Sequence, residues 1–424
     1  MTMLGSQSAA PKETISPDNL IKTLKKLQFT CAAVLGLAML AAVPAQGQTF
    51  STLHGFTGSP DGANPIGGLS RDSAGNLYGT TWMGGDQNVG TVFEVDSQGT
   101  ETVLYSFKGK RLSDPQGVIE GTNGNFYGTT QDGGTYQFGT IFKVTKTGKH
   151  SVLHSFKGYP TDGAYPSAGL IRDAAGNLYG TTHAGGSGGN CTGYYQGCGT
   201  VFMLSNAGIE TVLHSFIGGT DGAQPHTSLV QDAAGNLYGT TAAGGNANNC
   251  GAPGCGTVFM VSNTGVETVL YRFNGYPTDG QIPRAGLVLD QKGYLYGTTQ
   301  NGGASGFGTV FKLNRAGKET VLHSFNSGHR PDGEYPSAAL VRDAAGNLFG
   351  TTTYGPDTGC SGSGCGTVFK VTKTGKETVL YSFTGGADGA VPDAGLILDP
   401  AGNLYGITPQ AGASGVGNVF KLTP

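Results

Sequence analysis

The chain has 424 residues, of which 76 are glycine and only 12% are charged, and its net charge at neutral pH is −3. It contains no basic block, so it lacks the cations with which nucleic-acid-binding proteins neutralise phosphates. Glycine without a three-residue period, beside regular aromatic and β-branched positions, excludes collagen and long disorder and indicates many tight turns.

The first 45 residues differ from the rest. A basic segment ending at Lys26 precedes an apolar run over 29–43, and small residues around Pro44 offer a peptidase site. The run of about 15 residues is shorter than the roughly 20 that cross a bilayer. We predict a Sec-type signal peptide over 1–45, with a membrane anchor as the alternative. The mature chain, 46–424, then carries a net charge of −5 and no membrane span, and it is secreted or periplasmic.

Three motifs then recur in the same order seven times. The motif Gly-Asn-Leu-Tyr-Gly-Thr-Thr, or a near match, begins at Gly75, Gly124, Gly176, Gly235, Gly293, Gly346 and Gly402. The motif Gly-Thr-Val-Phe, or a near match, begins at Gly90, Gly139, Gly199, Gly256, Gly308, Gly366 and Gly417. The motif Thr-Val-Leu-His-Ser-Phe, or a near match, ends at Phe56, Phe107, Phe156, Phe216, Phe273, Phe325 and Phe383. Self-similarity with a period of about 50 residues indicates a solenoid, an array or a propeller.

One repeat predicts four short antiparallel strands, at 167–172, 177–182, 199–204 and 210–216. Asp and Gly residues close the turn between the first two strands, because Asp bonds the backbone two residues on and Gly adopts positive φ. Gly180 inside the second strand marks a bulge or a close backbone approach. No segment shows a helical period. Four strands per repeat is the size of a propeller blade, and a β-solenoid is the alternative.

The ends of the mature chain complete each other. Residues 50–56 form a fourth strand without a blade, and 417–422 form a third strand without a fourth. Pairing the two closes a ring and removes both exposed sheet edges. We therefore predict an all-β, seven-bladed propeller with four strands per blade, closed by the N-terminal strand. The blades span approximately 66–107, 116–156, 167–216, 226–273, 284–325, 337–383, and 393–424 joined by 49–56.

The Asp-x-x-Gly-Asn-Leu-Tyr turn is similar to NHL-type propeller repeats. With its Gly-Thr-Val-Phe and Thr-Val-Leu-His-Ser-Phe motifs, the whole unit more closely resembles the GloVer (Gloeo/Verruco) tandem repeat over residues 49–424. This resemblance implies an exported bacterial repeat protein whose role is unassigned and whose members carry varied surface anchors. Because the sequence stops at Pro424, we expect no such anchor in this chain.

Six cysteines remain after the signal peptide, and they fall into three local pairs. The pairs are Cys191 with Cys198, Cys250 with Cys255, and Cys360 with Cys365. In an oxidising compartment each pair is expected to form a disulfide, and a zinc site is the alternative. Each pair lies in an extended loop between the second and third strands, and the short loops have none. A disulfide offsets the conformational entropy of such a loop.

These variable loops share one face with the connection from each fourth strand to the next blade, and binding residues concentrate on such loops. The candidates there are His183 and the aromatic residues Trp82, Tyr136, Tyr194, Tyr195 and Tyr354. Exposed aromatic rings stack on sugars or anchor interfaces, and the alternative is packing of the loops on neighbouring blades. His183 and His226 are each a candidate general base, but no partner can be nominated for either.

Two further columns repeat in most blades. Asp followed by Gly recurs in the connections between blades, at Asp61, Asp162, Asp221, Asp279, Asp332 and Asp388. Carboxylates around a central channel would suit calcium, whereas a structural turn explains their repetition equally simply. Histidine alternates with tyrosine in the fourth strand, which indicates packing. We expect no cofactor and no catalytic residue.

We hypothesise a non-catalytic binding scaffold, monomeric, for a glycan or a surface protein. The first alternative is an enzyme of the lyase, hydrolase or lactonase type with its site in the channel, which would need several non-repeating polar residues around the axis. The second alternative is a structural component of the cell envelope.

Overall fold

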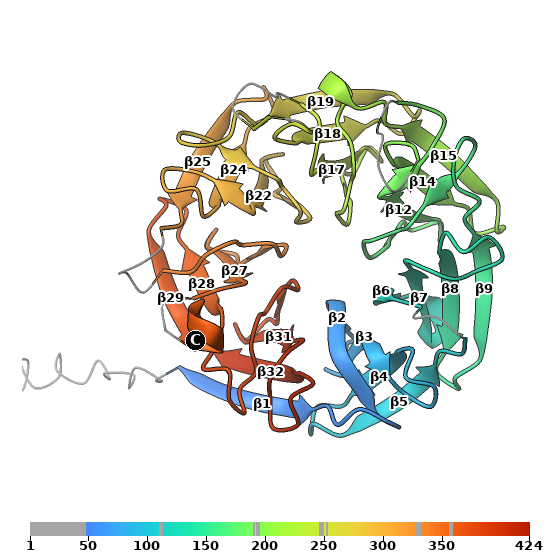
Figure 1. The fold of residues 1–424 in the computed structure, drawn as a ribbon, viewed down its shortest axis with the longest axis vertical. Coiled ribbons are helices and arrows are strands. Elements are labelled where there is room, and N and C mark those ends of the chain that lie inside the picture. The colour runs from blue at the N-terminus through green and yellow to red at the C-terminus, as the bar shows by residue number, and fades with distance from the viewer. Residues whose placement is uncertain are drawn as a thin grey trace, which may run out of the picture. The chain divides into compact units, whose positions relative to one another are not determined.

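Seven four-stranded antiparallel sheets surround one central axis in the computed structural model (Figure 1). The structure describes residues 48–424 except 110–112, 190, 192–195, 246–249, 252, 327–331 and 356–358. The predicted signal peptide lies outside the described residues. The seven-bladed propeller predicted from the repeats is confirmed.

Each blade is one sheet, and its four strands follow one another in order from the axis outward. The first four blades are β2 (Gly62–Arg71), β3 (Leu77–Gly84), β4 (Thr91–Val95) and β5 (Glu101–Ser106); β6 (Pro115–Glu120), β7 (Asn125–Thr130), β8 (Thr140–Thr145) and β9 (His150–Ser155); β11 (Ile171–Arg172), β12 (Leu178–Thr182), β14 (Thr200–Leu204) and β15 (Glu210–Ser215); and β16 (Val230–Gln231), β17 (Leu237–Thr241), β18 (Thr257–Val261) and β19 (Glu267–Arg272). The last three are β21 (Val288–Leu289), β22 (Leu295–Thr299), β24 (Thr309–Leu313) and β25 (Glu319–Ser324); β26 (Val341–Arg342), β27 (Leu348–Thr352), β28 (Thr367–Val371) and β29 (Glu377–Ser382); and β30 (Ile397–Leu398), β31 (Leu404–Thr408), β32 (Asn418–Thr423) and β1 (Thr49–Gly55).

Short elements supplement the blades. Two two-stranded ribbons join β10 (Gly163–Ala164) to β13 (Ala184–Gly185) and β20 (Gly280–Gln281) to β23 (Asn301–Gly302). Three single 3-10 turns are η1 (Thr122–Gly124), η2 (Gly219–Asp221) and η3 (Cys360–Gly362). The described residues contain no α-helix, as the absence of a helical period predicts.

The N-terminal strand closes the ring. β1 pairs antiparallel with β32, with Phe50 opposite Leu422 and His54 opposite Val419. The seventh blade therefore contains both ends of the described chain (Figure 1). Closure by the N-terminal strand is confirmed.

The repeated turn between the first two strands is held by its aspartate. In the third blade, Oδ1 of Asp173 accepts a hydrogen bond from the backbone N–H of Asn177 at 2.8 Å. Its Oδ2 accepts from the Asn177 side chain and from the hydroxyl of Tyr179, at 2.8 and 3.0 Å. The Asp, Asn and Tyr of the motif thus form one hydrogen-bonded unit, in which Gly176 has a φ of +90°. Only a glycine adopts that conformation without steric cost.

Gly180 makes a close approach and is not a bulge. A Cβ placed on it would lie 2.7 Å from the ring of Phe202, the Phe of Gly-Thr-Val-Phe, and 3.0 Å from Leu170. The ladder between β12 and β14 runs without a shift in register. The predicted first strand over 167–172 is too long, because only Ile171–Arg172 pairs with β12. The residues before it turn away from the ladder and line the axis instead.

The two threonines of the second strand have separate roles. Thr182 Oγ1 lies 2.8 Å from Thr200 Oγ1 within its own blade. Thr181 Oγ1 donates to the carbonyl of Thr227 in the next blade at 3.0 Å. The motif therefore contributes one bond inside the blade and one between blades here, whereas the seventh blade has Ile407 at the position of Thr181.

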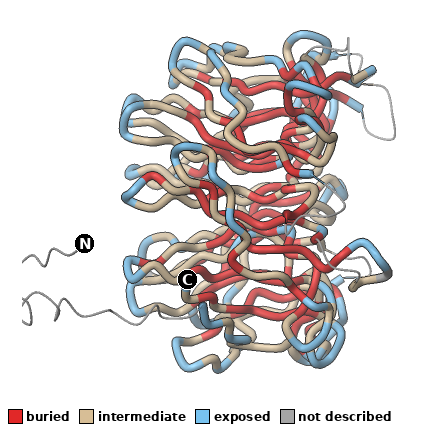
Figure 2. The backbone as a smooth tube through the Cα atoms, turned by 90° about the vertical axis from the view of Figure 1, so that its left-hand side faces the viewer, coloured by how far each residue is buried: buried red, intermediate tan, exposed pale blue. Residues whose placement is uncertain are grey.

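Phenylalanine contacts join all seven blades. At every junction the Phe that ends the fourth strand of one blade packs edge-on against the Phe of Gly-Thr-Val-Phe in the next, with ring centres 5.0–5.3 Å apart. These pairs, which we call the phenylalanine belt, are Phe56–Phe93, Phe107–Phe142, Phe156–Phe202, Phe216–Phe259, Phe273–Phe311, Phe325–Phe369 and Phe383–Phe420. Buried residues run through the blades, and exposed residues concentrate at the turns on both faces (Figure 2).

All three predicted disulfides are present. The second cysteine of each pair is fully buried, and it precedes Gly-Thr-Val-Phe at the position that Val89 or Phe138 fills in blades with short loops. Cys198, Cys255 and Cys365 each belong to the apolar cluster between two blades. The disulfides therefore fill the core as well as closing loops.

Histidine, aspartate and glutamate meet at four junctions between the outer strands. These junction triads are His54–Asp61–Glu101, His154–Asp162–Glu210, His214–Asp221–Glu267 and His323–Asp332–Glu377. In one of them, His154 Nε2 lies 3.0 Å from Asp162 Oδ2, which also accepts from the Lys157 N–H. Burial, and then the charge of Asp162, raise the pKa of Glu210 to about 7.

Truncating Phe56 tests closure directly. Phe56→Ala removes one contact of the belt and leaves a cavity at a fully buried position, so we expect a loss of about 3–5 kcal/mol in the free energy of unfolding. Phe216→Ala removes the equivalent contact in the middle of the chain and is the matched control. Chemical denaturation should give similar losses for both. If Phe56→Ala left the free energy of unfolding unchanged while Phe216→Ala lowered it, closure of the ring by the N-terminal strand would be contradicted.

The junction glutamates predict a pH dependence. The folded-state pKa of about 7 for Glu210 and Glu377 lies above the ordinary value of 4.5, so their stabilisation is present at low pH and is lost as the pH rises from about 5 to 8. Over this pH range the melting temperature of the double variant Glu210→Gln/Glu377→Gln should decrease less than that of the wild type. His183 and His226, whose pKa values are lowered, act in the opposite direction but equally in both proteins. Identical pH profiles would refute this assignment.

Candidate functional site

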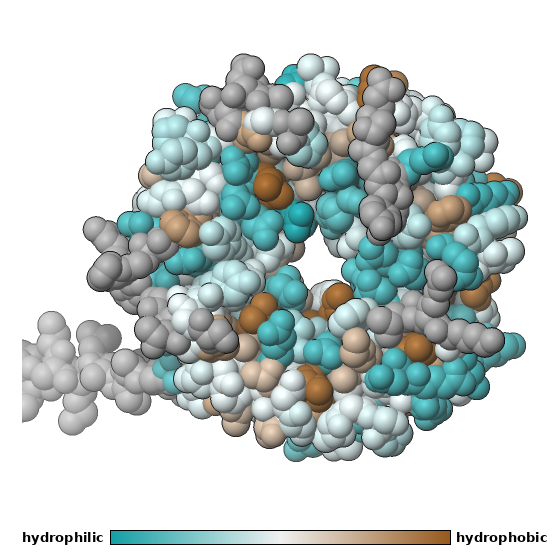
Figure 3. All heavy atoms as spheres, viewed as in Figure 1, coloured by the Kyte–Doolittle hydropathy of each residue, from teal (hydrophilic) through white to brown (hydrophobic). Residues whose placement is uncertain are grey.

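A cavity of about 400 Å³ lies on the propeller axis and is lined by all seven blades. Viewed along the axis, a central opening is visible, and the surface around it is mostly hydrophilic (Figure 3). Most of the lining is Gly, Ala or Ser, but the residue that follows the proline of each blade differs from blade to blade. These seven residues, which we call the axial ring, are Ile66, Gln116, Ser167, His226, Arg284, Ser337 and Asp393.

A strained backbone holds the axial ring. The residue before each proline has a positive φ of 46–60°, although none of the seven is glycine: Asn64, Asp114, Tyr165, Gln224, Ile282, Tyr335 and Val391. Such a conformation costs roughly 1–3 kcal/mol and persists only where its surroundings enforce it. The N–H of Tyr165 donates to Phe138 in the preceding blade at 2.8 Å, and its carbonyl accepts from the His183 N–H at 3.0 Å. These bonds connect the residue before the proline to the second-to-third loops of its own blade and of the preceding blade.

Three side chains from the third and fourth blades meet at the cavity. Ser167 Oγ lies 3.0 Å from His226 Nδ1, and the ring of His183 packs against that of His226 with centres 4.2 Å apart. Burial, and then His183 and Arg284, lower the pKa of His226 to about 3. Burial, and then Arg284, lower the pKa of His183 to about 4. Both imidazoles are therefore neutral at neutral pH.

Charged and amide groups complete the ring. Solvent reaches Arg284 and Asp393 through the opening, and neither takes part in an ion pair among the described residues. Protein nevertheless surrounds the Asp393 carboxyl on its other sides, and this desolvation raises its pKa to about 6. Gln116 donates to Asp114 Oδ1 at 2.8 Å. Burial, and then Asp132, raise the pKa of Asp114 to about 6.

The residues predicted from sequence lie partly at this cavity. His183 contacts the axial ring, and Trp82, which is half-buried, occupies the equivalent position in the first blade. Tyr136 is 48% exposed on its loop. Tyr354 is 36% exposed and packs edge-on against Tyr335 with ring centres 5.9 Å apart. Tyr194 and Tyr195 lie outside the described residues. A binding role for all six stays a prediction.

Five polar axial residues were not anticipated: Gln116, Ser167, Arg284, Ser337 and Asp393. The available signal is the column after the proline in the aligned repeats, because its neighbours repeat and it does not. The prediction from sequence assigned 167–172 to a first strand, whereas the chain at Ser167, after the positive φ at Tyr165, lines the axis. It therefore missed the one position of each blade that faces the axis with a variable side chain.

The carboxylates proposed as a calcium ring lie elsewhere. Asp61, Asp162, Asp279 and Asp332 contact His or Tyr side chains of outer strands and bond backbone amides of their own turns. They do not surround the channel, and their repetition is explained by the turn. The junction triads are the described groups in which three ligand-type side chains meet within 4.8 Å, and His183 and His226 belong to none of them.

The fold and the cavity together define a seven-bladed propeller with a ligand-sized axial site. The chain belongs to the Gloeobacter/Verrucomicrobia repeat family, whose model matches residues 39–194, 90–252, 188–363 and 247–424. This confirms the resemblance of its repeats to that family. No curated protein sequence matches the chain.

Two solved structures are similar to this chain at low sequence identity. The extracellular domain of a protein described as a one-component system, from B. thetaiotaomicron, matches with a TM-score of 0.54 and 10% identity over 87% of this chain. This chain spans only 39% of the length of that domain. A gluconolactonase from Xanthomonas campestris matches with a TM-score of 0.40 and 14% identity, over 70% of this chain and 81% of the other.

The disulfides indicate an oxidising compartment, extracellular or periplasmic. Within the described part of the chain, no helix is long and apolar enough to cross a membrane.

The serine–histidine pair makes a clear prediction. A general base works best with a pKa near the working pH, and His226, at about 3, is a weak acceptor for the Ser167 proton. A fluorophosphonate probe at pH 7.5 should therefore label wild type no more than Ser167→Ala, as read by mass spectrometry. A known serine hydrolase serves as the positive control. Labelling that disappears in Ser167→Ala would identify a reactive nucleophile.

Proposed function

We propose that the protein is an exported binding propeller that holds an acidic sugar, or the acidic end of a glycan, in its axial cavity. The observation that carries this proposal is the axial ring. Seven structurally equivalent positions contain six polar residues of five types, whereas the positions around them repeat. A structural role predicts repetition in every blade, and a single ligand lying on the axis predicts a different contact from each blade.

The charges favour an acidic ligand. Arg284 presents a guanidinium inside the cavity without an ion-pair partner among the described residues, and guanidinium groups bind carboxylates through two parallel hydrogen bonds. The imidazoles of His183 and His226 are neutral, so Arg284 is the cation of the axial ring and Asp393 is its acidic group. The cavity volume of about 400 Å³ lies within the range of small-molecule sites.

The other polar residues favour a ligand rich in hydroxyl groups. Gln116, Ser167 and Ser337 supply both donors and acceptors, and Asp393 supplies a carboxyl group. Around the opening, Trp82 and Tyr354 offer aromatic surface for further sugar rings. We further propose that the signal peptide over 1–45 is removed, that the propeller spans 46–424, and that it acts as a monomer.

An enzyme acting in the channel is the second candidate, because Ser167 and His226 are within hydrogen-bond distance. We favour binding over catalysis. The low pKa of His226 weakens it as a base, and the group packed on its ring is His183 instead of an orienting carboxylate.

Removing the axial cation tests the proposal. Arg284→Ser introduces the residue found at the equivalent positions Ser167 and Ser337, so the fold should be retained. Calorimetric titration with galacturonate should show at least tenfold weaker binding than wild type, because the carboxylate loses its charged partner. Galactose, which lacks the acid group, should bind wild type weakly and be unaffected by the substitution.

The matched control is Arg272→Ser, which removes a cation from the outer strand β19 and installs the residue found there in other blades, such as Ser215 and Ser324. It should bind galacturonate as wild type does. Equal affinities of wild type and Arg284→Ser, or no galacturonate binding by wild type, would exclude the acidic-sugar proposal.

A further inference from the structure

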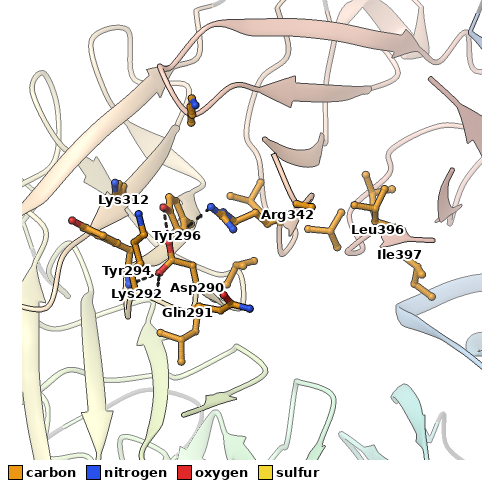
Figure 4. Close-up of a pocket in the computed structure, with 16 residues that line it drawn as sticks. Asp290, Gln291, Lys292, Tyr294, Tyr296, Lys312, Arg342, Leu396 and Ile397 are labelled. Atoms are coloured by element: carbon orange, nitrogen blue, oxygen red, sulfur yellow. Dashed lines mark hydrogen bonds and ion pairs between the residues drawn. The ribbon is translucent and has the colours of Figure 1, made fainter. Parts of the chain in front are cut away.

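A second and larger pocket lies on the opposite face, which carries the short Asp-x-x-Gly turns. Its volume is about 1190 Å³, and it is formed by the fifth, sixth and seventh blades. We call it the far-face pocket. Its two ends differ: charged and aromatic side chains gather around Asp290 and Arg342, whereas Leu396 and Ile397 lie at the other end (Figure 4).

The polar end has an excess of cations. Lys292, Lys312, Arg342 and Lys373 line it, and Asp290 is the one acidic residue in the lining. Asp290 is occupied by its own turn, where it accepts hydrogen bonds from the Lys292 and Tyr294 N–H groups at 2.9 Å. Arg342 lies 3.9 Å from it. This concentration of positive charge occurs in a chain whose net charge is −3, so the far-face pocket attracts anions.

The fifth blade breaks the repeat at this end. In five other blades the turn reads Asp-x-Ala-Gly-Asn, and the Asn side chain bonds the Asp, as Asn177 does with Asp173. The fifth blade has Lys292 and Tyr294 instead. It has exchanged a structural hydrogen bond for a cation and an aromatic ring. The Lys312 ammonium lies 3.9 Å from the centre of the Tyr294 ring and holds it in place.

The other end is apolar. Val288, Leu289, Val341, Ile397 and Leu398 line the pocket and are only half-buried, so aliphatic surface stays exposed to solvent beside the cations. Covering this surface is favourable, because it removes apolar area from water. An acidic sugar, which is polar throughout, would satisfy the cations but not this surface.

We propose that the far-face pocket binds an amphiphilic carboxylate, with its acidic head at Lys292, Lys312, Arg342 and Lys373 and its hydrocarbon body on the aliphatic end. The ligand is a single dissolved molecule. The apolar end is formed inside the pocket by the innermost strands β21, β26 and β30, so it suits one molecule that enters the pocket better than a flat membrane surface. This proposal is independent of the axial site, because the two pockets have different lining residues.

The test restores the repeat in the fifth and sixth blades. Lys292→Ala/Tyr294→Asn/Lys373→Asn installs residues found at the same positions elsewhere in the propeller, such as Ala175, Asn177 and Asn206. The variant should therefore fold, which an unchanged melting temperature verifies. Titration with decanoate at pH 7.5, below its micelle concentration, should show at least tenfold weaker binding than wild type. Lys318→Thr removes a cation outside the pocket on the same face and should bind decanoate as wild type does.

Two further ligands distinguish the contribution of the acidic head group from that of the hydrocarbon chain. Acetate has the head alone and decyl maltoside has a neutral head on the same chain, and both should bind wild type at least tenfold more weakly than decanoate. The proposal is overturned if wild type does not bind decanoate, if the triple variant binds it equally, or if Lys318→Thr weakens binding as much. It is also overturned if wild type binds phosphatidylglycerol vesicles or an oligonucleotide but not monomeric decanoate.

Discussion

The propeller depends on the edge-to-face contact between two phenylalanines at each junction of blades. One Phe ends a fourth strand, and the other belongs to the Gly-Thr-Val-Phe of the following blade, over a glycine that has no side chain to obstruct it. Such pairs contribute about 0.5–1.5 kcal/mol beyond the area they bury. Because each contact joins neighbours, the chain gains the seventh only when its first strand meets its last sheet, and Phe56 supplies it.

The same repetition explains where specificity is located. In most blades the Asp, Asn, Tyr, Thr and Phe of the motifs are engaged in turns, ladders and junctions, which explains why these positions repeat with few exceptions, such as Tyr294 and Ile407. The residue after each proline has no such role. The strained backbone at the residue before the proline, as at Tyr165, directs the axial residue toward the axis. Symmetric blades thereby present seven independent side chains to one point.

The repeats alone predicted most of the fold. The blade count, the strand order, the closing strand and the three cysteine pairs all follow from motif spacing. The axial ring was not predicted, because the segment after each proline was assigned to an apolar first strand, and the positive φ at residues such as Gln224 is not evident from the sequence. The calcium hypothesis placed Asp162 at the channel, which is wrong. The spacing of the repeats shows that Asp162 lies in the connection between two blades, but it does not show how far this residue is from the axis. Tyr136 and Tyr354 are exposed on their loops, and their binding role stays a prediction. The far-face turn of the fifth blade was visible in the sequence as a departure at Tyr294, although only the assembled blades show its neighbouring cations.

The second cysteine of each disulfide has a consequence for how such proteins diversify. Cys198 occupies a site that Val or Phe fills elsewhere, so a thiol there is an acceptable core residue even before it acquires a partner. A longer loop with one further cysteine is then tethered without any rearrangement of the sheets beneath it. Insertions on this face therefore do not destabilise the propeller, and the binding properties of each loop can change independently of the others.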